Sequence, residues 1–550
     1  RYTTEIDMAK HSSAGVYVKE YDLSQTVRAA TLSIGVIVGS SRKGPVNQRT
    51  LITSTKQFLQ TFGKPNASAL PPQNGGLHNT GAHFMHYAAL EFLNESSQLY
   101  VTRVAPEART GGLRVYYDGN FNHAESWAGG TEFPAEEPFG SQDLFHVYGV
   151  DPGVWNDGIS VQFLPNVYQD DSSFYVLVFS GLRGVAVESF LVTLYDSIDG
   201  FGRQTNIENV INNGSQYIRV SQNRNHADFI ANPKRNFMNS VVAGTGSTMG
   251  VPLVGGSDGV QPTFGDIINA WTLYEDPEVV DINMLINGGY SVPPIQQAMV
   301  SLAEDRMDCV AILDMPSHAQ TVQGAMDYRR NLLNIDSSYA ALYSPDYLIH
   351  DKYNDIQLYV PPSGHVAAAY AHTDNNYNVW FAPAGMSRGN LLIDGVRHEY
   401  NLGDRDALVE SQINPTRVFE GRGIKIWGAD TLQSMQSSLS NVSVRRLMIF
   451  LEKSLAEAAL YSVFDPNDEI LRAFLVDLCE RFLRPIKDAR GIYWFGVKCD
   501  EENNPPESIA NGDVILDVYI DPSIPVKRIH LTAIVNRTGS RVIGTARNNG

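Results

Sequence analysis

Two strand-like segments of this chain have no neighbour in sequence with which they could pair. Residues 15–21 (GVYVKEY) and 529–535 (IHLTAIV) carry strand-like patterns, and polar or proline-containing stretches isolate them. An unpaired strand leaves a row of backbone donors and acceptors open, and these need a sheet edge from elsewhere. We therefore expect a globular body that has one detached strand before it and one after it.

Between these segments the sequence alternates predicted strands and helices. A buried strand is predicted over 32–39, a further strand over 99–104 and an apolar strand over 309–313. Helices are predicted from Ser54, where Gln57 completes a capping box, and over 81–94. This rhythm is typical of α/β units, so the expected fold class is mixed α/β. A chain of 550 residues with 43% hydrophobic side chains allows roughly two to four domains.

The middle of the chain has a different composition. Gly, Pro, Glu and Asn are frequent over 106–138, which is predicted as long loops. Short β-rich runs resume between 161 and 220, and a second α/β rhythm begins near Phe264. The middle region is therefore expected to be an insertion with its own fold.

Two amphipathic helices in tandem are predicted further on. The first covers 442–461, and the second begins with Asp465 as N-cap and Pro466 as first helical residue. The side chains that the second helix is expected to bury are Ile470, Phe474, Leu475, Leu478 and Phe482. A strand is predicted after them, over 514–520.

Charge and composition exclude several classes of protein. The formal charge of -18 and the pI near 5.1 argue against a nucleic-acid surface, which needs clustered Lys and Arg. The arginines that recur late in the chain, Arg528, Arg537, Arg541 and Arg547, are interpreted as solvated or as subunit contacts. Three cysteines without close spacing predict neither a zinc site nor a disulfide framework. No apolar run predicts a signal peptide or a membrane span.

Candidate chemical motifs are weak. The glycine-rich stretch 244–250 has the wrong spacing for a dinucleotide loop, and 255–259 is interpreted as a turn. Ser363, His365 and Asp374 could be combined into a triad, but a helix N-cap at Ser363 is the preferred interpretation. His83 and His86 are interpreted as a polar helix face. The sequence therefore predicts no catalytic, metal or cofactor site. The alternative hypothesis is a hydrolase that uses Ser363 as its nucleophile.

The chain resembles the contractile tail sheath family of myophages, which is related to the sheaths of R-type pyocins and other contractile injection systems. The likeness lies in three stretches. These include 14–20 with 44–47 and 58–63; 199–203, 255–259, 306–308 and 314–316; and 338–343, 361–364, 382–385, 413–415, 427–432, 445–447, 464–468 and 497–500. The region 106–157 matches least.

The resemblance implies a domain plan. It consists of an N-terminal arm at 1–30, the first part of a core domain at 31–105, inserted β-rich outer domains at 106–260, a second inserted α/β region at 261–340, the C-terminal part of the core at 341–525 and a C-terminal arm at 526–550. In this family the two arms add strands to other subunits. The arm residues implied here are Val16, Tyr17, Val18, Lys19 and Tyr21, and Ile529, Leu531, Ala533 and Val535.

The resemblance also implies a function. The chain would be the structural, non-enzymatic subunit of a contractile tail sheath in the virion, made in the host cytoplasm, that polymerises helically around an inner tail tube and contracts for genome ejection. Its partners would be further copies, the tube protein, and baseplate and tail terminator proteins, without nucleic acid or membrane insertion. Arg472, Arg481 and Arg484 are candidate tube contacts. The alternative is the sheath of a bacterial injection system or an R-type tailocin.

Overall fold

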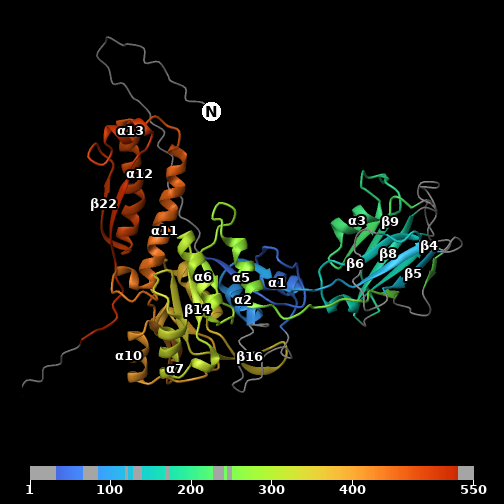
Figure 1. Ribbon diagram of the computed structural model, residues 1–550, viewed down its shortest axis with the longest axis horizontal. Coiled ribbons are helices and arrows are strands. Elements are labelled where there is room, and N and C mark those ends of the chain that lie inside the picture. Colours follow the sequence, from blue (N-terminus) through green and yellow to red (C-terminus); the bar gives the residue numbers. More distant parts are fainter. Residues whose placement is uncertain are drawn as a thin grey trace, which may run out of the picture. The chain divides into compact units, whose positions relative to one another are not determined.

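The computed structural model describes residues 33–65, 84–117, 122–127, 139–166, 173–181, 184–226, 241–243 and 250–530 (Figure 1). These residues form two compact units. Leu451–Pro522 form the C-terminal unit, and residues 33–450 with 523–530 form the main unit. Both units combine helices and sheets, so the expected mixed α/β class is confirmed.

A nine-stranded sheet lies at the centre of the main unit, in the order β18-β21-β20-β15-β14-β13-β1-β3-β2. Its strands are β1 (Ile34–Gly39), β2 (Thr50–Ile52), β3 (Gln98–Arg103), β13 (Met284–Ile286), β14 (Val310–Asp314), β15 (Ala340–Ser344), β18 (Asn390–Leu391), β20 (Ile413–Phe419) and β21 (Gly423–Ile426). Neighbours from β20 to β3 run parallel, and the pairs at both edges are antiparallel. Parallel strands covered on both faces need continuous apolar runs, and every residue of β1 is buried.

Residues 261–340 were predicted as a second inserted region, separate from the core domain. This prediction is wrong for the strands of the region, which belong to the main sheet. β13 pairs with β1 on one side and with β14 on the other, so both strands from this region lie in the middle of the main sheet. The apolar pattern of β14 was recognised, but local periodicity carries no information about which sheet a strand joins.

Helices cover both faces of the main sheet. Side chains alternate along each strand, so Val36 and Val38 contribute to one core and Ile37 to the other. The first core includes residues of α5 (Phe264–Trp271), α6 (Pro293–Arg306), α7 (Val322–Asp327) and α10 (Leu402–Glu410). The second includes residues of α1 (Thr55–Phe62), α2 (Phe84–Glu95) and α8 (Ser363–Asn376), and of the small sheet of β16 (Tyr347–Asp351), β17 (Ile356–Val360) and β19 (Gly395–Val396). Ser54 caps α1 as predicted, because its hydroxyl accepts from the backbone N–H of Gln57 at 3.2 Å.

Residues 112–252 contain two further sheets around a separate core. The strands are β4 (Gly112–Tyr117), β5 (Asn122–Ser126), β6 (Asp143–Gly149), β10 (Ile218–Gln222) and β11 (Val241–Ala243) in one sheet, and β7 (Ile159–Pro165), β8 (Ser173–Ser180), β9 (Ala186–Thr193) and β12 (Val251–Pro252) in the other. The prediction of long loops over 106–138 is wrong for β4 and β5, which pair antiparallel. Both strands are short and lie in a Gly- and Glu-rich segment, so amino-acid composition alone does not predict them.

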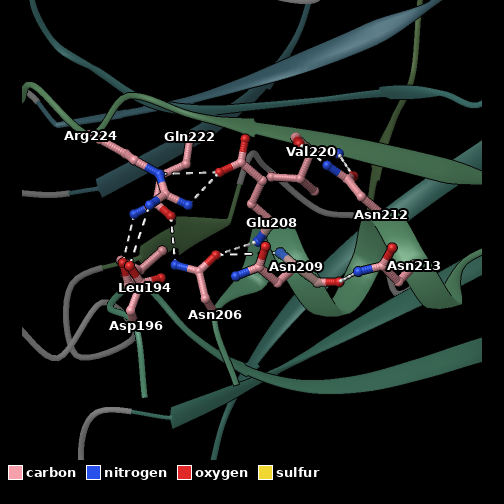
Figure 2. A network of polar contacts seen from close by, with 10 residues as sticks. All are labelled: Leu194, Asp196, Asn206, Glu208, Asn209, Asn212, Asn213, Val220, Gln222 and Arg224. Atoms are coloured by element: carbon pink, nitrogen blue, oxygen red, sulfur yellow. Dashed lines mark hydrogen bonds and ion pairs between the residues drawn. The ribbon is translucent and has the colours of Figure 1, made fainter. Parts of the chain in front are cut away.

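Asparagine side chains fix α3 (Ile207–Gly214) to this β-rich part (Figure 2). The Oδ1 atom of Asn206 accepts from two backbone N–H groups of the first turn of α3, and its Nδ2 atom donates to Gln222 at 3.0 Å. Asn212 exchanges two hydrogen bonds with the backbone of Val220 on β10. An asparagine N-cap contributes about 1 kcal/mol, and here it also joins the helix to a strand.

Arg103 joins the β-rich part to the main sheet. Its side chain is fully buried and donates to the carbonyl oxygens of Ser41 at 2.8 Å, Gly44 at 2.7 Å and Pro152 at 2.6 Å. Burial lowers its pKa to about 10. The ammonium group of Lys43 lies 4.5 Å from the centre of the Trp155 ring, which adds a cation–π contact at the same junction.

The C-terminal unit contains α12 (Glu469–Asp488), β22 (Ile492–Lys498), α13 (Pro506–Asn511) and β23 (Asp517–Pro522), and α11 (Val442–Ala459) leads into it. The predicted start of the second helix at Asp465 is wrong. Asp468 is the N-cap, because its carboxylate accepts from the backbone N–H of Leu471 at 2.8 Å. Leu475 and Leu478 are buried as predicted, whereas Ile470 is 77% exposed.

No described helix has both the length and the apolar character needed to cross a membrane.

Candidate assembly interface

The pair β22–β23 forms a sheet that no other described strand joins. The strands run antiparallel from Ile492 opposite Pro522 to Lys498 opposite Asp517, with an irregularity after Ile492. α12 packs against β22. A two-stranded sheet is marginally stable, and each outer edge offers backbone groups to a further strand. This sheet is therefore the candidate site for strand addition.

Aromatic side chains line the solvent side of this sheet. Tyr493, Trp494 and Tyr519 are 64%, 55% and 53% exposed. Gly496 lies opposite Tyr519, and a Cβ atom there would come within 2.7 Å of the Trp494 ring. The glycine thus leaves room for the ring to lie across the strand. Large aromatic surfaces beside an open edge favour binding of an added strand.

Most of the predicted arm residues lie outside the part of the chain that the structure describes. Val16, Tyr17, Val18, Lys19 and Tyr21 of the N-terminal arm and Leu531, Ala533 and Val535 of the C-terminal arm lie outside the described residues. Ile529 is described and is 86% exposed, and Val526 before it is 78% exposed. The first part of the C-terminal arm thus presents apolar side chains to solvent, as a segment that binds elsewhere would.

The three arginines predicted as tube contacts differ in how far their side chains are exposed to solvent. Arg472 is 8% exposed and donates to the side chain of Asn467 at 3.1 Å, so it is not a surface contact. Arg481 and Arg484 are exposed, and each pairs with an acidic residue one helical turn earlier, as in ordinary solvated helix pairs. A tube contact through Arg481 and Arg484 stays a prediction.

The residues considered for a triad have separate partners. The Ser363 hydroxyl donates to Asp314 at 2.8 Å, His365 packs edge-on against a tyrosine ring, and Asp374 is bonded to Arg446. The expected N-cap role of Ser363 is wrong as well, because Ser363 is already the first residue of α8. The hydroxyl that a hydrolase would use is buried in a structural contact.

Asp314 connects three segments at the carboxyl end of β14. Its Oδ1 atom accepts from the backbone N–H of Ser363 at 2.6 Å, and its Oδ2 atom accepts from the Ser363 hydroxyl and from the backbone N–H of Gly289 at 3.1 Å. The residue is fully buried. Burial raises the pKa of Asp314 to about 7, although the bonds from Ser363 and Gly289 oppose the rise.

This carboxyl group predicts a pH dependence of stability. An unfolded aspartate titrates near pH 3.9, so folded Asp314 keeps its proton over a range in which the unfolded chain has lost it. Its contribution to the free energy of unfolding is complete below about pH 4 and is lost, by on the order of 4 kcal/mol, as the pH rises through about 7. Urea denaturation of the wild type and of Asp314→Asn between about pH 5 and 8 measures this. The variant should show the flatter dependence, and equal slopes would contradict the assignment.

Other motifs have structural roles. In the 255–259 turn, Asp258 accepts from the backbone N–H of Val154 at 2.9 Å. Residues 244–249 and His83 lie outside the described part of the chain. His86 is buried with its Nε2 atom 3.3 Å from the carbonyl oxygen of Phe62, so its expected place on a polar helix face is wrong. Among the described residues, no group of His, Cys, Asp and Glu side chains is placed to hold a metal ion.

Comparison with known proteins connects this architecture to a family. A family model described as phage tail sheath protein central domain matches residues 262–432, and one described as phage tail sheath C-terminal domain matches residues 434–536. The tail sheath protein of Enterobacteria phage T4 is 30% identical over 307 residues, which cover 52% of this chain and 46% of the T4 protein. That of Vibrio phage KVP40 is 27% identical over 337 residues, 56% of this chain and 50% of the relative. The chain thus spans about half the length of the curated relatives it matches.

Solved structures show the same fold at low identity. The sheath tail protein of Desulfitobacterium hafniense has a TM-score of 0.55 and 13% identity, over 92% of this chain and 97% of that one. The sheath complex of an extracellular contractile injection system in its contracted state has a TM-score of 0.52 and 15% identity, over 96% of this chain and 99% of that one.

The layered α/β core and the matched central and C-terminal domains define a sheath-type structural protein. The chain belongs to the phage tail sheath protein family.

Proposed function

We propose that this chain is the structural subunit of a contractile tail sheath. It polymerises helically around an inner tail tube and contracts from a metastable extended state, which drives the tube through the host envelope for genome ejection. It catalyses no reaction. The observation that carries the proposal is the two-stranded sheet β22–β23 with open edges, inside the matched C-terminal sheath domain.

The predicted arms fit these edges in length and pattern. Segments 15–21 and 529–535 have seven residues each, against seven in β22 and six in β23. Added on the two sides, they would turn a marginal pair into a four-stranded sheet. The backbone would supply affinity, and the alternating side chains would set the register.

Strand exchange of this kind makes a head-to-tail contact that does not close on itself, so repetition builds a helical tube. Each backbone hydrogen bond contributes only about 0.5–1.5 kcal/mol, so one arm alone binds weakly. Several links per subunit make the assembly durable through effective concentration. The arms can hold while the bodies of the subunits move past one another.

The energy of contraction is proposed to be stored in the assembly. The extended lattice is a kinetically trapped state with a higher free energy than the contracted lattice, and release at the baseplate allows the transition. A modest free-energy difference per subunit in favour of the contracted lattice adds up over all the subunits of the tube. The proposed partners are other copies of the chain, the tube protein near Arg481 and Arg484, and baseplate and terminator proteins. The proposed location is the virion tail, after synthesis in the host cytoplasm.

A sheath of a bacterial contractile injection system or an R-type tailocin is the second candidate. The fold likeness to an injection-system sheath favours it. Genes for a capsid and a terminase next to the gene for this chain would decide for a phage, and their absence would decide for the alternative.

Negative-stain electron microscopy of the purified protein tests the proposed function. We expect hollow tubes of regular diameter to form as the protein concentration rises, because every subunit both donates arms and accepts them. A protein that remains monomeric at high concentration, even when the tube protein is present, would contradict the proposal.

A further inference from the structure

Exposed carboxylates gather at the end of the C-terminal unit that contains α13. They are Asp465, Asp468, Glu469, Asp500, Glu501, Glu502, Glu507 and Asp513, which we call the acidic end. Between residues 498 and 513 the sequence has one basic residue, Lys498, and this pairs with Glu502. Most of the negative charge of the acidic end is therefore left without a cation in these segments.

Asparagine side chains hold the segments of the acidic end together. Asn467 donates to the carbonyl oxygen of Asp513 at 2.9 Å, which places the beginning of α12 beside α13 (Figure 1). Asn504 both donates to and accepts from the backbone of Ile515, at 2.9 and 2.7 Å. Asn503 donates to the carboxylate of Asp517 at 3.0 Å. The carboxylates thus lie on one prearranged surface.

An apolar knob adjoins the acidic end. The turn between α11 and α12 exposes Leu460, Tyr461, Val463 and Phe464, whose exposed fractions are 69%, 68%, 54% and 101%, and the first turn of α12 exposes Ile470, at 77%. Phe464 has a φ angle of 76°, in the left-handed region that bulky residues avoid. The chain therefore holds a strained backbone with the Phe464 ring in solvent. A group of large apolar side chains at such a site marks contact with another molecule.

The segment with complementary chemistry belongs to the same sequence. Residues 451–522 contain 15 Asp and Glu against 7 Lys and Arg, whereas 523–550 contain 5 Lys and Arg and no Asp or Glu. Beyond the predicted arm, Arg537, Arg541 and Arg547 surround the apolar pair Val542 and Ile543. Arginine binds carboxylates in a fixed fork geometry, and the apolar pair suits the knob.

The direction of β23 favours a second copy as the source of this segment. β23 starts at Asp517, beside the acidic end, and runs away from it to Pro522. A six-residue strand covers about 17 Å, so the chain leaves the strand at its far end. Lys527 then pairs with Asp430 of the main unit. The chain therefore leaves the C-terminal unit at the end opposite to its own acidic end.

We propose that residues 536–550 of one copy dock on the acidic end and the apolar knob of a second copy. The arginines bind the carboxylates, and Val542 and Ile543 pack against Phe464. This inference rests on the proposed sheath function and adds a link between subunits beyond the exchanged strands.

A fluorescently labelled peptide of residues 536–550, titrated with the full chain and followed by anisotropy, tests the proposal. We expect saturable binding that weakens as salt is added, because the contact is between exposed charges. The double variant Glu501→Lys/Asp513→Lys should bind at least about tenfold more weakly. The control Asp488→Lys/Glu420→Lys changes the net charge equally at exposed sites outside the acidic end and should bind like the wild type. A peptide with Arg541→Glu and Arg547→Glu should prefer the Glu501→Lys/Asp513→Lys chain.

Equal binding to both double variants would overturn the proposal. At concentrations at which the full chain is monomeric, binding only to a chain that lacks 536–550 would also overturn it, since the segment would then occupy its own chain. The two proposals fail separately. If tubes form but the peptide does not bind, the proposed docking is wrong and the proposed sheath function stands. If the peptide binds but no tubes form, the sheath function is wrong and the binding site for the segment stands.

Discussion

Deletion of residues 1–21 is expected to abolish polymerisation and to leave a folded monomer. The deleted segment contains the predicted arm strand 15–21, whereas the three hydrophobic cores of the main unit are built from residue 34 onward. Loss of one arm per subunit removes one of the links on which the helical assembly depends, so the effect on tube formation should be essentially complete. Circular dichroism and thermal unfolding check the fold, and sedimentation with electron microscopy checks assembly.

A shorter deletion is the matched control. Removal of residues 1–14 keeps the predicted strand and should leave tube formation intact. The arm model is wrong if the chain without residues 1–21 still forms sheaths in micrographs.

Asp374→Ala is expected to destabilise the main unit by about 3–5 kcal/mol, because it leaves a buried guanidinium without its partner. Arg446 donates to Asp374, and the side chains are 3% and 8% exposed. The Ser33 hydroxyl donates to the same carboxylate oxygen at 3.4 Å, and the guanidinium lies 4.8 Å from the centre of the Tyr370 ring. The carboxylate therefore connects the segment before β1 with α8 and α11, and chemical denaturation measures its removal.

Asp477→Ala removes a comparable ion pair at the surface. Asp477 pairs with Arg481 on α12, where both side chains are about half exposed. We expect a loss of a few tenths of a kcal/mol for this variant. A similar small loss for Asp374→Ala would show that the buried pair contributes no more than a solvated one.

The sequence predicted the elements whose burial is uniform or periodic. β1 and β14 are continuous apolar runs because helices cover both faces of a parallel sheet. The second α/β rhythm predicted near Phe264 begins with α5, in which Ile267 and Trp271 are both buried. The partners of each strand were not predictable, since the pairing of β13 between β1 and β14 joins residues that are distant in sequence.

The candidate interface was predicted only in part. β23 (Asp517–Pro522) overlaps the predicted strand 514–520, but β22 was missed because its exposed aromatic residues break the alternation of a half-buried strand. The run of Tyr493, Trp494 and Phe495 after Gly491 is the signal that could have found it. The start of α12 was misplaced because Asp465 followed by Pro466 is a good local start signal, while the hydrogen bond from Leu471 to Asp468 decides the cap.

Cryo-electron microscopy of the assembled protein tests strand exchange directly. The map should show residues 15–21 and 529–535 hydrogen-bonded along the outer edges of β22 and β23, each contributed by a different copy from the one that owns the sheet. A map in which both segments fold back on their own subunit would contradict the account.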